Sequence, residues 1–498
     1  MILFFLIANL QFFDYIFDSF VFTPIKLMIA NKLTSLLFQN FVFEPTEEQK
    51  NTMLLLADFV NDSQEKGIFL LKGYAGTGKT TLVSSLVKSL VPVRKKSILL
   101  APTGRAAKVL SVYSKKQAFT IHKKIYWFKT NAFGKSFLSL QENKHTNTIF
   151  IVDEASMIPD LSDKEFGGRN LLNDLVEYIY SGVNCKLILI GDTAQLPPVH
   201  LSISPALNKK TLEFEFNKRI TQVQLTQVVR QQSDSMILTN ATSLRNHISK
   251  KSSNFPQVQC NKDVVSLQSG VDIQDALEDA YSLDGVEQTV VICRSNKRAN
   301  LYNQQIRARI RFQEDEISVG DFIMVVRNNY FWLPTSSKSG FIANGDTAEV
   351  LRIYEINDIY EFKFARVLIR LIDYPEMDDL EVVIMLDLLQ SDAPSLTFDE
   401  FKKLSSNIEE DYKDIPKKMD RIKELKKNPF MNALQVKFSY AVTCHKSQGG
   451  QWKNVFVEQG YFIQEMLSIE YFRWLYTAFT RSTEKLYLIN FKKEFFAK

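Results

Sequence analysis

The sequence contains little cysteine and little histidine, and this limits the chemistry that the chain can support. Its four cysteines, Cys185, Cys260, Cys293 and Cys444, include no pair in Cys-x-x-Cys spacing, and its five histidines are dispersed. A disulfide framework and a structural zinc site both need clustered residues, so neither is expected. The pattern is typical of a reduced protein, and we expect a cytoplasmic location.

Long hydrophobic runs are also missing. An apolar stretch at residues 1–13 is too short to span a bilayer. It also lacks the basic start and the small-residue cleavage site of a signal peptide. We interpret residues 1–42 as a docking helix or as a segment upstream of the true start, with Met28 as a candidate initiator. A membrane anchor is the alternative, but we expect no stable membrane association.

No strong charge of either sign is present. The 498 residues carry 61 Lys and Arg against 56 Asp and Glu, for a net charge of +5, and 45% of them are hydrophobic. This composition excludes a mostly disordered chain and a polytopic membrane protein. The small basic excess neither identifies nor opposes a nucleic-acid binder. The length predicts roughly two to four domains.

Short apolar runs separated by amphipathic stretches predict an α/β fold from about residue 43. Four runs lie at 68–71, 97–100, 149–152 and 187–190, and three more lie at 289–292, 454–457 and 485–489. Two sets of runs predict two α/β domains. We place the first at 43–250 and the second at 275–320 together with 438–498.

Residues 321–437, between the two parts of the second domain, have a different pattern. Alternating apolar residues and turns such as Asn344-Gly345-Asp346 predict a small antiparallel β module. Within it, residues 398–428 are dense in Lys, Glu and Asp, which indicates an exposed helical insertion. A plain solvated face is the alternative interpretation of that insertion.

The strongest single motif is glycine-rich. Gly73-Tyr-Ala-Gly-Thr-Gly-Lys79-Thr80 matches the pattern G-x-x-x-x-G-K-[ST] between an apolar strand and a helix-like run. Such glycines let backbone N–H groups converge on phosphate oxygens at a helix N-terminus. We expect Lys79 to reach the β- and γ-phosphates of ATP and Thr80 to coordinate Mg²⁺. The residues expected to bind the nucleotide at this loop are Gly73, Gly76, Thr77, Gly78, Lys79, Thr80 and Thr81.

Two further strand ends support ATP hydrolysis. Ile149-Phe-Ile-Val-Asp153-Glu154 is an apolar strand that ends in two carboxylates. Asp153 is expected to hold Mg²⁺, directly or through water, and Glu154 to orient or deprotonate the attacking water. A third strand ends at Gly191-Asp192, and Gln195 shortly after it is a candidate sensor of the γ-phosphate.

The order of the remaining motifs resembles that of superfamily 1 helicases of the RecD-like and Dda-like branch. The resemblance extends over residues 43–490. It rests on the motifs Phe43-Glu-Pro-Thr46-Glu-Glu-Gln49, Ala101-Pro-Thr-Gly-Arg-Ala-Ala-Lys108, Phe119-Thr-Ile-His122, Asp153-Glu-Ala-Ser156, Gly191-Asp-Thr-Ala-Gln-Leu-Pro-Pro198, Leu225-Thr-Gln-Val-Val-Arg230-Gln231, Tyr440-Ala-Val-Thr-Cys-His-Lys446-Ser447-Gln448-Gly449 and Tyr476-Thr-Ala-Phe-Thr480-Arg481.

The resemblance implies two RecA-like P-loop domains, with a small β-hairpin insertion in the first and an SH3-like β insertion in the second. It also implies that Gln49 contacts adenine and that Arg230 and Arg481 reach the γ-phosphate across the cleft. A guanidinium there would stabilise charge on the transferring phosphoryl group. The implied DNA-binding residues are Pro102, Thr103, Arg105, Thr120 and His122 on the first domain and Thr443, His445, Lys446, Ser447 and Gln448 on the second.

In relatives, a β-hairpin at the position of residues 123–148 acts as a pin that splits the duplex. This segment carries five aromatic residues, and one at its tip could stack on a base pair. Ordinary packing is the alternative. The aromatic residues are Tyr126, Trp127, Phe128, Phe133 and Phe137.

The motifs together predict a monomeric, ATP-dependent DNA helicase. The resemblance implies movement in the 5′-to-3′ direction, single-stranded DNA and forked or tailed duplexes as substrates, and replication or repair proteins as partners. Three alternatives stay open: an RNA-directed motor, a nucleic-acid-stimulated ATPase that remodels protein–DNA complexes, and a nucleotide kinase or NTP-binding switch. The second α/β domain with its own arginine disfavours the last.

Overall fold

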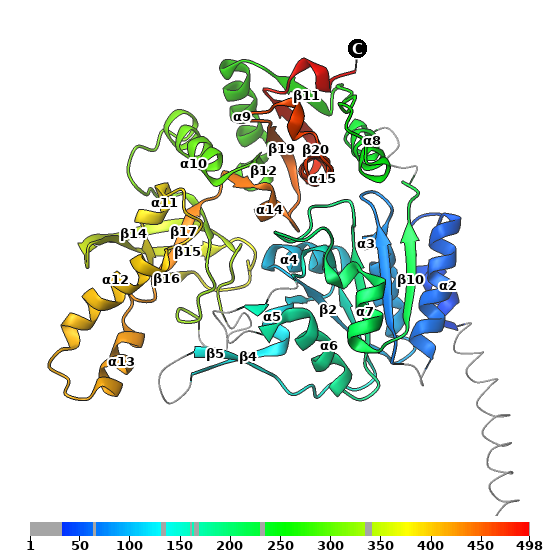
Figure 1. Ribbon diagram of the computed structural model, residues 1–498, viewed down its shortest axis with the longest axis horizontal. Helices are drawn as coiled ribbons and strands as arrows, with labels where there is room; N and C mark the ends of the chain where they lie inside the picture. Colours follow the sequence, from blue (N-terminus) through cyan, green and yellow to red (C-terminus); the bar gives the residue numbers. More distant parts are fainter. Residues whose placement is uncertain are drawn as a thin grey trace, which may run out of the picture.

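The computed structural model describes residues 32–62, 66–130, 136–159, 162–163, 169–229, 235–333 and 341–497. Two α/β domains and a β-barrel surround a common centre, with the barrel carrying a projecting helical arm (Figure 1). The apolar residues 1–31 lie outside the described ranges. Among the residues described, no helix has both the length and the apolar character needed to cross a membrane.

Six parallel strands form the sheet of the first domain, in the order β10-β1-β9-β6-β2-β3. The strands are β1 (Ile68–Gly73), β2 (Lys96–Ala101), β3 (Ala118–Thr120), β6 (Thr148–Val152), β9 (Lys186–Gly191) and β10 (Ile220–Leu225). The near-continuous apolar sequences of β1, β6 and β9 suit the centre of a parallel sheet that is covered on both faces, whereas the edge strand β10 alternates.

Alternate residues of β1 face opposite sides of this sheet, as the strand period of two requires. Phe69 and Leu71 share a core cluster with α2 (Glu47–Asn61), α3 (Lys79–Leu90) and a helix over 32–40. Ile68 and Leu70 pack on the opposite side. The helices on that side are α5 (Ile121–Ile125), α6 (Leu171–Ser181) and α7 (Lys209–Phe216), while α4 (Gly104–Ser114) follows β2.

The second domain is a five-stranded parallel sheet in the order β11-β20-β19-β12-β18. Its strands are β11 (Val264–Leu267), β12 (Thr289–Cys293), β18 (Ala441–Thr443), β19 (Trp452–Glu458) and β20 (Ser482–Ile489). Its helices are α8 (Met236–Lys250), α9 (Gly270–Asp284), α10 (Asn296–Gln305), α14 (Cys444–Ser447) and α15 (Ile469–Phe479).

The position of α8 differs from the domain boundary drawn on the sequence, which assigned it to the first domain. Its apolar residues Ile237, Ala241 and Leu244 recur at helical spacing and join the core of the second domain together with Phe472 of α15. An apolar stripe on a helix does not specify which domain covers it. The second domain therefore begins earlier in the chain than residue 275.

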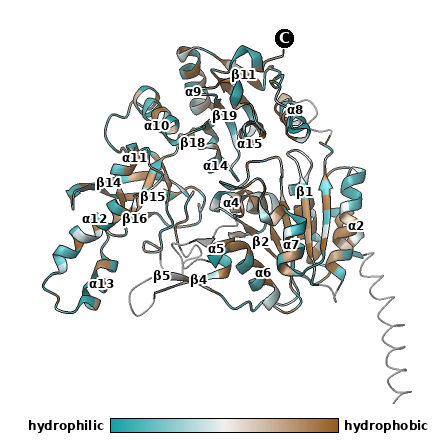
Figure 2. Ribbon diagram, in the orientation of Figure 1, coloured by the Kyte–Doolittle hydropathy of each residue, from teal (hydrophilic) through white to brown (hydrophobic). Residues whose placement is uncertain are grey.

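A closed barrel of five strands stands between β12 and β18 in the chain. Its strands are β13 (Phe322–Val325), β14 (Thr347–Ile359), β15 (Phe362–Leu371), β16 (Leu380–Met385) and β17 (Leu434–Phe438). Short α11 (Asp387–Gln390) follows β16, and the arm then consists of α12 (Phe398–Glu409) and α13 (Lys418–Lys427). The arm is largely hydrophilic, whereas strands inside the domains are hydrophobic (Figure 2).

The predicted fold class, two P-loop-type α/β domains with a hairpin insertion and an SH3-like β insertion, is confirmed. The hairpin consists of the antiparallel strands β4 (Tyr126–Thr130) and β5 (Ser136–Leu140). A second, shorter pair consists of β7 (Ser162–Asp163) and β8 (Arg169–Asn170). In Figure 1, β4 and β5 lie below the first domain, on the side toward the barrel.

Candidate nucleotide site and nucleic-acid cleft

The glycine-rich loop joins the end of β1 to the first turn of α3. Gly76 and Gly78 have φ angles of 75° and 81°, in the left-handed region that residues with a Cβ rarely adopt. A Cβ at Gly78 would also lie 2.5 Å from the Nε2 atom of Gln49. The loop backbone therefore requires both glycines. The loop continues directly into the N-terminus of α3, where backbone N–H groups are free to bind phosphate.

Lys79 lies over this loop. Its Nζ donates to the carbonyl oxygens of Gly73 at 2.7 Å and Tyr74 at 2.9 Å. Phosphate oxygens in the loop would compete for the same ammonium donors. The structure thus places Lys79 at the loop, and its contact with phosphate stays a prediction. Thr80 and Thr81 stand in the first turn of α3, next to it.

Gln49 uses both ends of its side-chain amide within the protein. Its Oε1 accepts from the Thr46 backbone N at 2.9 Å, as part of a capping box that starts α2. Its Nε2 donates to the Thr77 carbonyl at 3.0 Å. Gln49 therefore ties α2 to the glycine-rich loop, and the expected contact with adenine stays a prediction.

The adjacent carboxylates stand at the end of β6. The Oδ1 of Asp153 accepts from the backbone N of Glu154 at 2.9 Å. Burial raises the pKa of Asp153 to about 6, the charge of Glu154 adds to the shift, and Lys79 opposes it. The charge of Lys79 compensates only part of the burial, so the Asp153 carboxylate favours a further cation, and Mg²⁺ prefers oxygen ligands. Asp153 and the Thr80 hydroxyl therefore fit the expected magnesium role.

The loop after β9 brings two more polar residues to this region. Asp192 is buried, and burial raises its pKa while Lys79 and a hydrogen bond from Tyr476 oppose the shift. Gln195 is also buried, and its Oε1 has no hydrogen-bond partner among the residues that the structure describes. A buried oxygen without a partner costs about 1–3 kcal/mol. Gln195 therefore marks a position where a bound ligand or water would supply a donor.

Arg481 approaches these carboxylates from the second domain. It follows α15 and is 4% exposed, and its Nη1 lies 4.0 Å from Oε1 of Glu154. Its own domain holds it, because its Nε donates to the Thr477 carbonyl at 3.1 Å and its Nη1 to the Gly450 carbonyl at 3.3 Å. The structure thus brings Arg481 and Glu154 together across the domain boundary. Arg230 lies outside the described residues.

Tyr476 makes a contact that the sequence analysis did not assign. Its hydroxyl accepts from the backbone N of Ala75 in the glycine-rich loop at 2.8 Å and donates to Oδ2 of Asp192 at 2.6 Å. The residue is 1% exposed. The sequence does not indicate this contact, because Tyr476 stands within an apolar helix. A buried tyrosine hydroxyl needs a hydrogen-bond partner, but no local pattern says which partner it has.

Thr477 of α15 and Gln448, which directly follows α14, extend this interdomain contact. The Thr477 Oγ1 accepts from the Leu196 backbone N at 2.8 Å. The Gln448 Nε2 donates to the Leu196 carbonyl at 2.7 Å. Both polar groups of the Leu196 backbone are therefore held by side chains of the second domain, directly beside Gln195.

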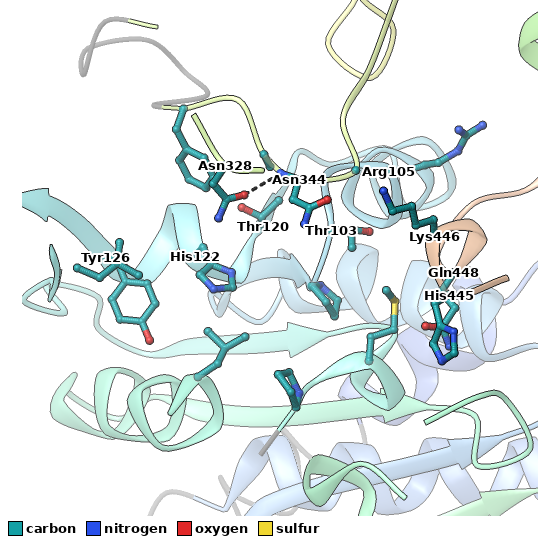
Figure 3. Close-up of a pocket in the computed structure, with 18 of the residues that line it drawn as sticks. Thr103, Arg105, Thr120, His122, Tyr126, Asn328, Asn344, His445, Lys446 and Gln448 are labelled. Atoms are coloured by element: carbon teal, nitrogen blue, oxygen red, sulfur yellow. Dashed lines mark hydrogen bonds between the residues drawn. The ribbon is translucent and has the colours of Figure 1, made fainter. Parts of the chain in front are cut away.

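A cavity of about 430 Å³ gathers eight of the ten residues that were expected to bind DNA (Figure 3). The barrel adds a third wall through Asn328, Phe341, Ala343, Asn344 and Gly345. From the first domain the lining residues are Pro102, Thr103, Arg105, Thr120 and His122, and from the second domain they are His445, Lys446 and Gln448. We call this cavity the central cleft.

The central cleft lies at the carboxyl ends of strands, where short helices begin. Thr103 follows β2 and caps α4 by accepting from Ala106 N at 3.2 Å. Thr120 ends β3 and caps α5 by accepting from Lys123 N at 3.3 Å. Hydroxyls and helix N-termini are suitable groups for contacts with phosphate.

Burial reduces the positive charge that the cleft holds by itself. It lowers the pKa of His122 to about 4, so this imidazole is neutral at pH 7. Burial, together with the smaller effect of the Lys437 charge, lowers the pKa of Lys446 to about 8. Lys123, beside the cleft, has its pKa lowered to about 8 by burial, against the opposing charge of Asp346. An anion in the cleft would favour the charged form of both lysines.

Three of the expected DNA-binding residues either point away from the other residues of the cleft or do not line it. The Arg105 guanidinium lies 3.9 Å from the ring centroid of Trp452, and in Figure 3 its side chain points away from the other labelled residues. Ser447 is fully buried and donates to the Cys444 carbonyl at 2.8 Å. Neither Ser447 nor Thr443 lines the cleft. Their contacts with DNA stay predictions.

Two asparagines of the barrel were missed by the sequence analysis. The Oδ1 of Asn328 accepts from the backbone N of Asn344 at 2.7 Å, and both side chains lie at the cleft in Figure 3. The turn that holds Asn344 packs against the first domain. A Cβ at Gly104 would lie only 2.3 Å from Oδ1 of Asp346. The sequence offered only the Asn-Gly-Asp turn, which predicts that the chain changes direction but not that Asn344 lies at the cleft.

The aromatic residues of the hairpin divide into two kinds. Tyr126 is buried, and its hydroxyl donates to Oδ2 of Asp174 at 2.6 Å, so it serves packing and lines the cleft. Trp127 is 55% exposed. The side chains of Phe128, Phe133 and Phe137 lie outside the described residues. Trp127 is therefore the candidate that the described part of the hairpin leaves for stacking on a base pair.

We predict that Asp153→Asn leaves the nucleotide-free protein at least as stable at pH 7 while abolishing ATP hydrolysis. Because the folded-state pKa lies above the unfolded one, ionising Asp153 destabilises the fold as the pH rises from about 4 through about 6. The stability advantage of the variant should grow over that window. Melting temperatures measured from pH 4 to pH 7 without Mg²⁺ would test this.

Asp284→Asn serves as the control. Hydrogen bonds from Lys453 and Asn454 lower the pKa of Asp284, so this variant should lose stability relative to the wild type as the pH rises. A variant at Asp153 that melts well below the wild type at pH 7 would contradict the assignment.

Comparison with known proteins supports the two-domain interpretation. Residues 47–257 match the family described as AAA domain, and residues 438–489 match the UvrD-like helicase C-terminal domain. The chain is 23% identical over 504 residues to the uncharacterised protein R530 of Acanthamoeba polyphaga mimivirus, with 88% of this chain and 98% of that protein covered.

Named helicases are also among the relatives. The ATP-dependent DNA helicase dda of Enterobacteria phage T4 is 29% identical over 291 residues, which cover 56% of this chain and 60% of that protein. A crystal structure of Pif1 helicase from Bacteroides in complex with ADP-AlF3 and ssDNA is similar at 16% identity and a TM-score of 0.46, over 92% of this chain and 95% of that one. Its motif order, its two matched domains and its similarity to the dda helicase identify the chain as a member of the superfamily 1 helicases of the RecD-like and Dda-like branch.

Proposed function

We propose that this protein is an ATP-driven motor that moves along single-stranded DNA in the 5′-to-3′ direction and unwinds duplexes. One observation supports this most directly. Gln448 lines the central cleft, and its amide also holds the Leu196 carbonyl beside Gln195. In this proposal a displacement at either site would be passed to the other through this one side chain, which would couple hydrolysis to movement.

The residues at the nucleotide side have complementary roles in this proposal. Lys79 would exchange its two loop carbonyls for phosphate oxygens, and Arg481 would add charge from the second domain as the transferring phosphoryl group becomes more negative. Glu154 would accept a proton from the attacking water. Thr80 and Asp153 would hold Mg²⁺, which would neutralise part of the phosphate charge.

The residues at the central cleft are suited to reversible tracking. Hydroxyls, helix N-termini and the lysine Lys446 can contact phosphates without reading bases. The modest net charge of +5 fits a protein that must release its track in every cycle. Trp127 at the hairpin would meet the duplex where the strands part. The direction of movement follows from the resemblance to the RecD-like branch.

Unwinding of duplexes that carry a single-stranded tail at the 5′ or the 3′ end, prepared as DNA and as RNA, tests the function. We expect ATP-dependent strand separation only for DNA with a 5′ tail. Unwinding from 3′ tails would overturn the direction, and equal activity on RNA would support an RNA-directed motor. ATP hydrolysis that single strands stimulate without any unwinding would support a remodelling ATPase instead.

We predict that Lys446→Met weakens binding of single-stranded DNA about tenfold, because one charge-assisted phosphate contact is lost. ATP hydrolysis without DNA should stay near the wild-type rate. Fluorescence anisotropy with a labelled oligonucleotide measures the first quantity, and phosphate release measures the second. Lys485→Met, an exposed lysine of the same domain outside the cleft, is the control. Equal affinities of the two variants would argue against the cleft as the DNA site.

We predict that Tyr476→Phe lowers DNA-stimulated ATP turnover about tenfold while ATP binding is retained. Removing the hydroxyl leaves the Ala75 N–H and the Asp192 carboxylate without their shared partner, so closure of the two domains is weakened. Single-turnover hydrolysis and nucleotide binding separate the two effects. Tyr487→Phe, a buried tyrosine stacked on Phe456, should change neither. Full stimulation in Tyr476→Phe would show that this contact does not couple the domains.

A further inference from the structure

A second cavity of about 360 Å³ lies where the barrel meets its helical arm. One wall is the segment after β13, which includes Arg327 and Phe331, and the other is the segment from the end of α13 to β17. Asn328 lines both this cavity and the central cleft. The two cavities therefore share a lining residue and lie next to each other.

Hydrogen bonds fix the shape of this second cavity. The carbonyl of Asn432 accepts from Nδ2 of Asn329 at 2.8 Å and from the indole Nε1 of Trp332 at 2.8 Å. The Asn432 side chain in turn donates to the carbonyls of Lys426 and Asn428, both at 2.8 Å. These bonds join the two walls, so the cavity is formed before any ligand arrives.

The cavity contains a cation that lacks a partner. The Nζ atom of Lys426 is buried and makes no hydrogen bond to the described residues, and burial lowers its pKa. The guanidinium of Arg327 adds positive charge at the other wall, 5.2 Å from the ring centroid of Phe401. None of the described residues lining the cavity is acidic. Because a buried ammonium without a counter-charge is costly, the site is complementary to an anion.

Next to this cation the cavity offers an aromatic surface. Phe331 is 38% exposed, and Trp332 holds it edge-on with the ring centroids 5.0 Å apart. Aromatic rings accept bases by stacking without regard to sequence. A nucleotide carries both a phosphate and a base, joined by its sugar, and the cavity has a group suited to each of the two.

We propose that this second cavity is a further subsite for the tracked single strand, with a backbone phosphate at Lys426 and a base on Phe331. The inference rests on the proposed function, since it assumes that a strand occupies the central cleft. It gives the charged arm a role: α13 supplies the cation, and the arm lengthens the contact with the strand beyond the two α/β domains.

Binding of oligonucleotides from about 6 to about 20 nucleotides long, to the full chain, tests the subsite. Short strands should bind Lys426→Met as they bind the wild type. The longest should bind it about tenfold more weakly, with the slope of log affinity against log salt reduced by about 0.7 for one lost phosphate contact. Lys427→Met is the matched control, because that neighbouring lysine is exposed and pairs with Glu424 at 2.8 Å. Phe331→Ala, on the opposite wall, should repeat the length-dependent loss.

The outcomes separate the two proposals. A wild type that binds neither short nor long strands would contradict the proposed function itself. A wild type that binds both, with Lys426→Met and Lys427→Met alike at every length, would overturn the subsite alone. Binding of dAMP that depends on Lys426, without any gain in affinity for longer strands, would make the cavity a site for free nucleotides and would also overturn the subsite.

Discussion

The hydroxyl of Tyr476 joins the two α/β domains at the point where both must act on one nucleotide. It holds a backbone N–H of the glycine-rich loop and the Asp192 carboxylate together, at 2.8 and 2.6 Å. The neighbouring contacts of Thr477 and Gln448 with Leu196 are hydrogen bonds as well. Each such bond contributes about 0.5–1.5 kcal/mol net. In the proposed motor, such an interface would have a defined geometry and could still open in every cycle, which a large apolar interface would hinder.

The geometry of this interface depends on small residues as much as on polar ones. Gly449 has a φ of 75°, and a Cβ there would lie 2.7 Å from the Ala106 Cβ of α4. The first turn of α4 thus touches the second domain and also the barrel, through Gly104 and Asp346. Because α4 begins directly after β2, its capping residue Thr103 lies where all three units meet. The central cleft is a consequence of this three-way contact.

Much of this arrangement could be predicted from the sequence, for identifiable reasons. Buried parallel strands are nearly continuous apolar runs, so β1, β2, β6 and β9 were found, whereas three-residue strands such as β3 and β18 carry too little pattern. The motif residues of the cleft were found through the resemblance. Tyr476, Asn328 and Asn344 were missed, because their roles depend on partners hundreds of residues away or in the barrel. No local pattern specifies such partners.

The same limit explains why some side chains make contacts in the structure other than those that their motifs imply. Gln49 and Arg105 were assigned by motif to a base and to DNA, yet the fold gives the first a loop carbonyl and the second an indole ring. Only the partner of Arg105 lies across a domain boundary, since Trp452 belongs to the second domain, whereas Gln49 and Thr77 both belong to the first. A polar side chain whose present partner sits across such a boundary is held in one state and released in the other. In the proposed motor, a relative movement of the two domains would release Arg105 from Trp452, whereas Gln49 would stay with the glycine-rich loop of its own domain.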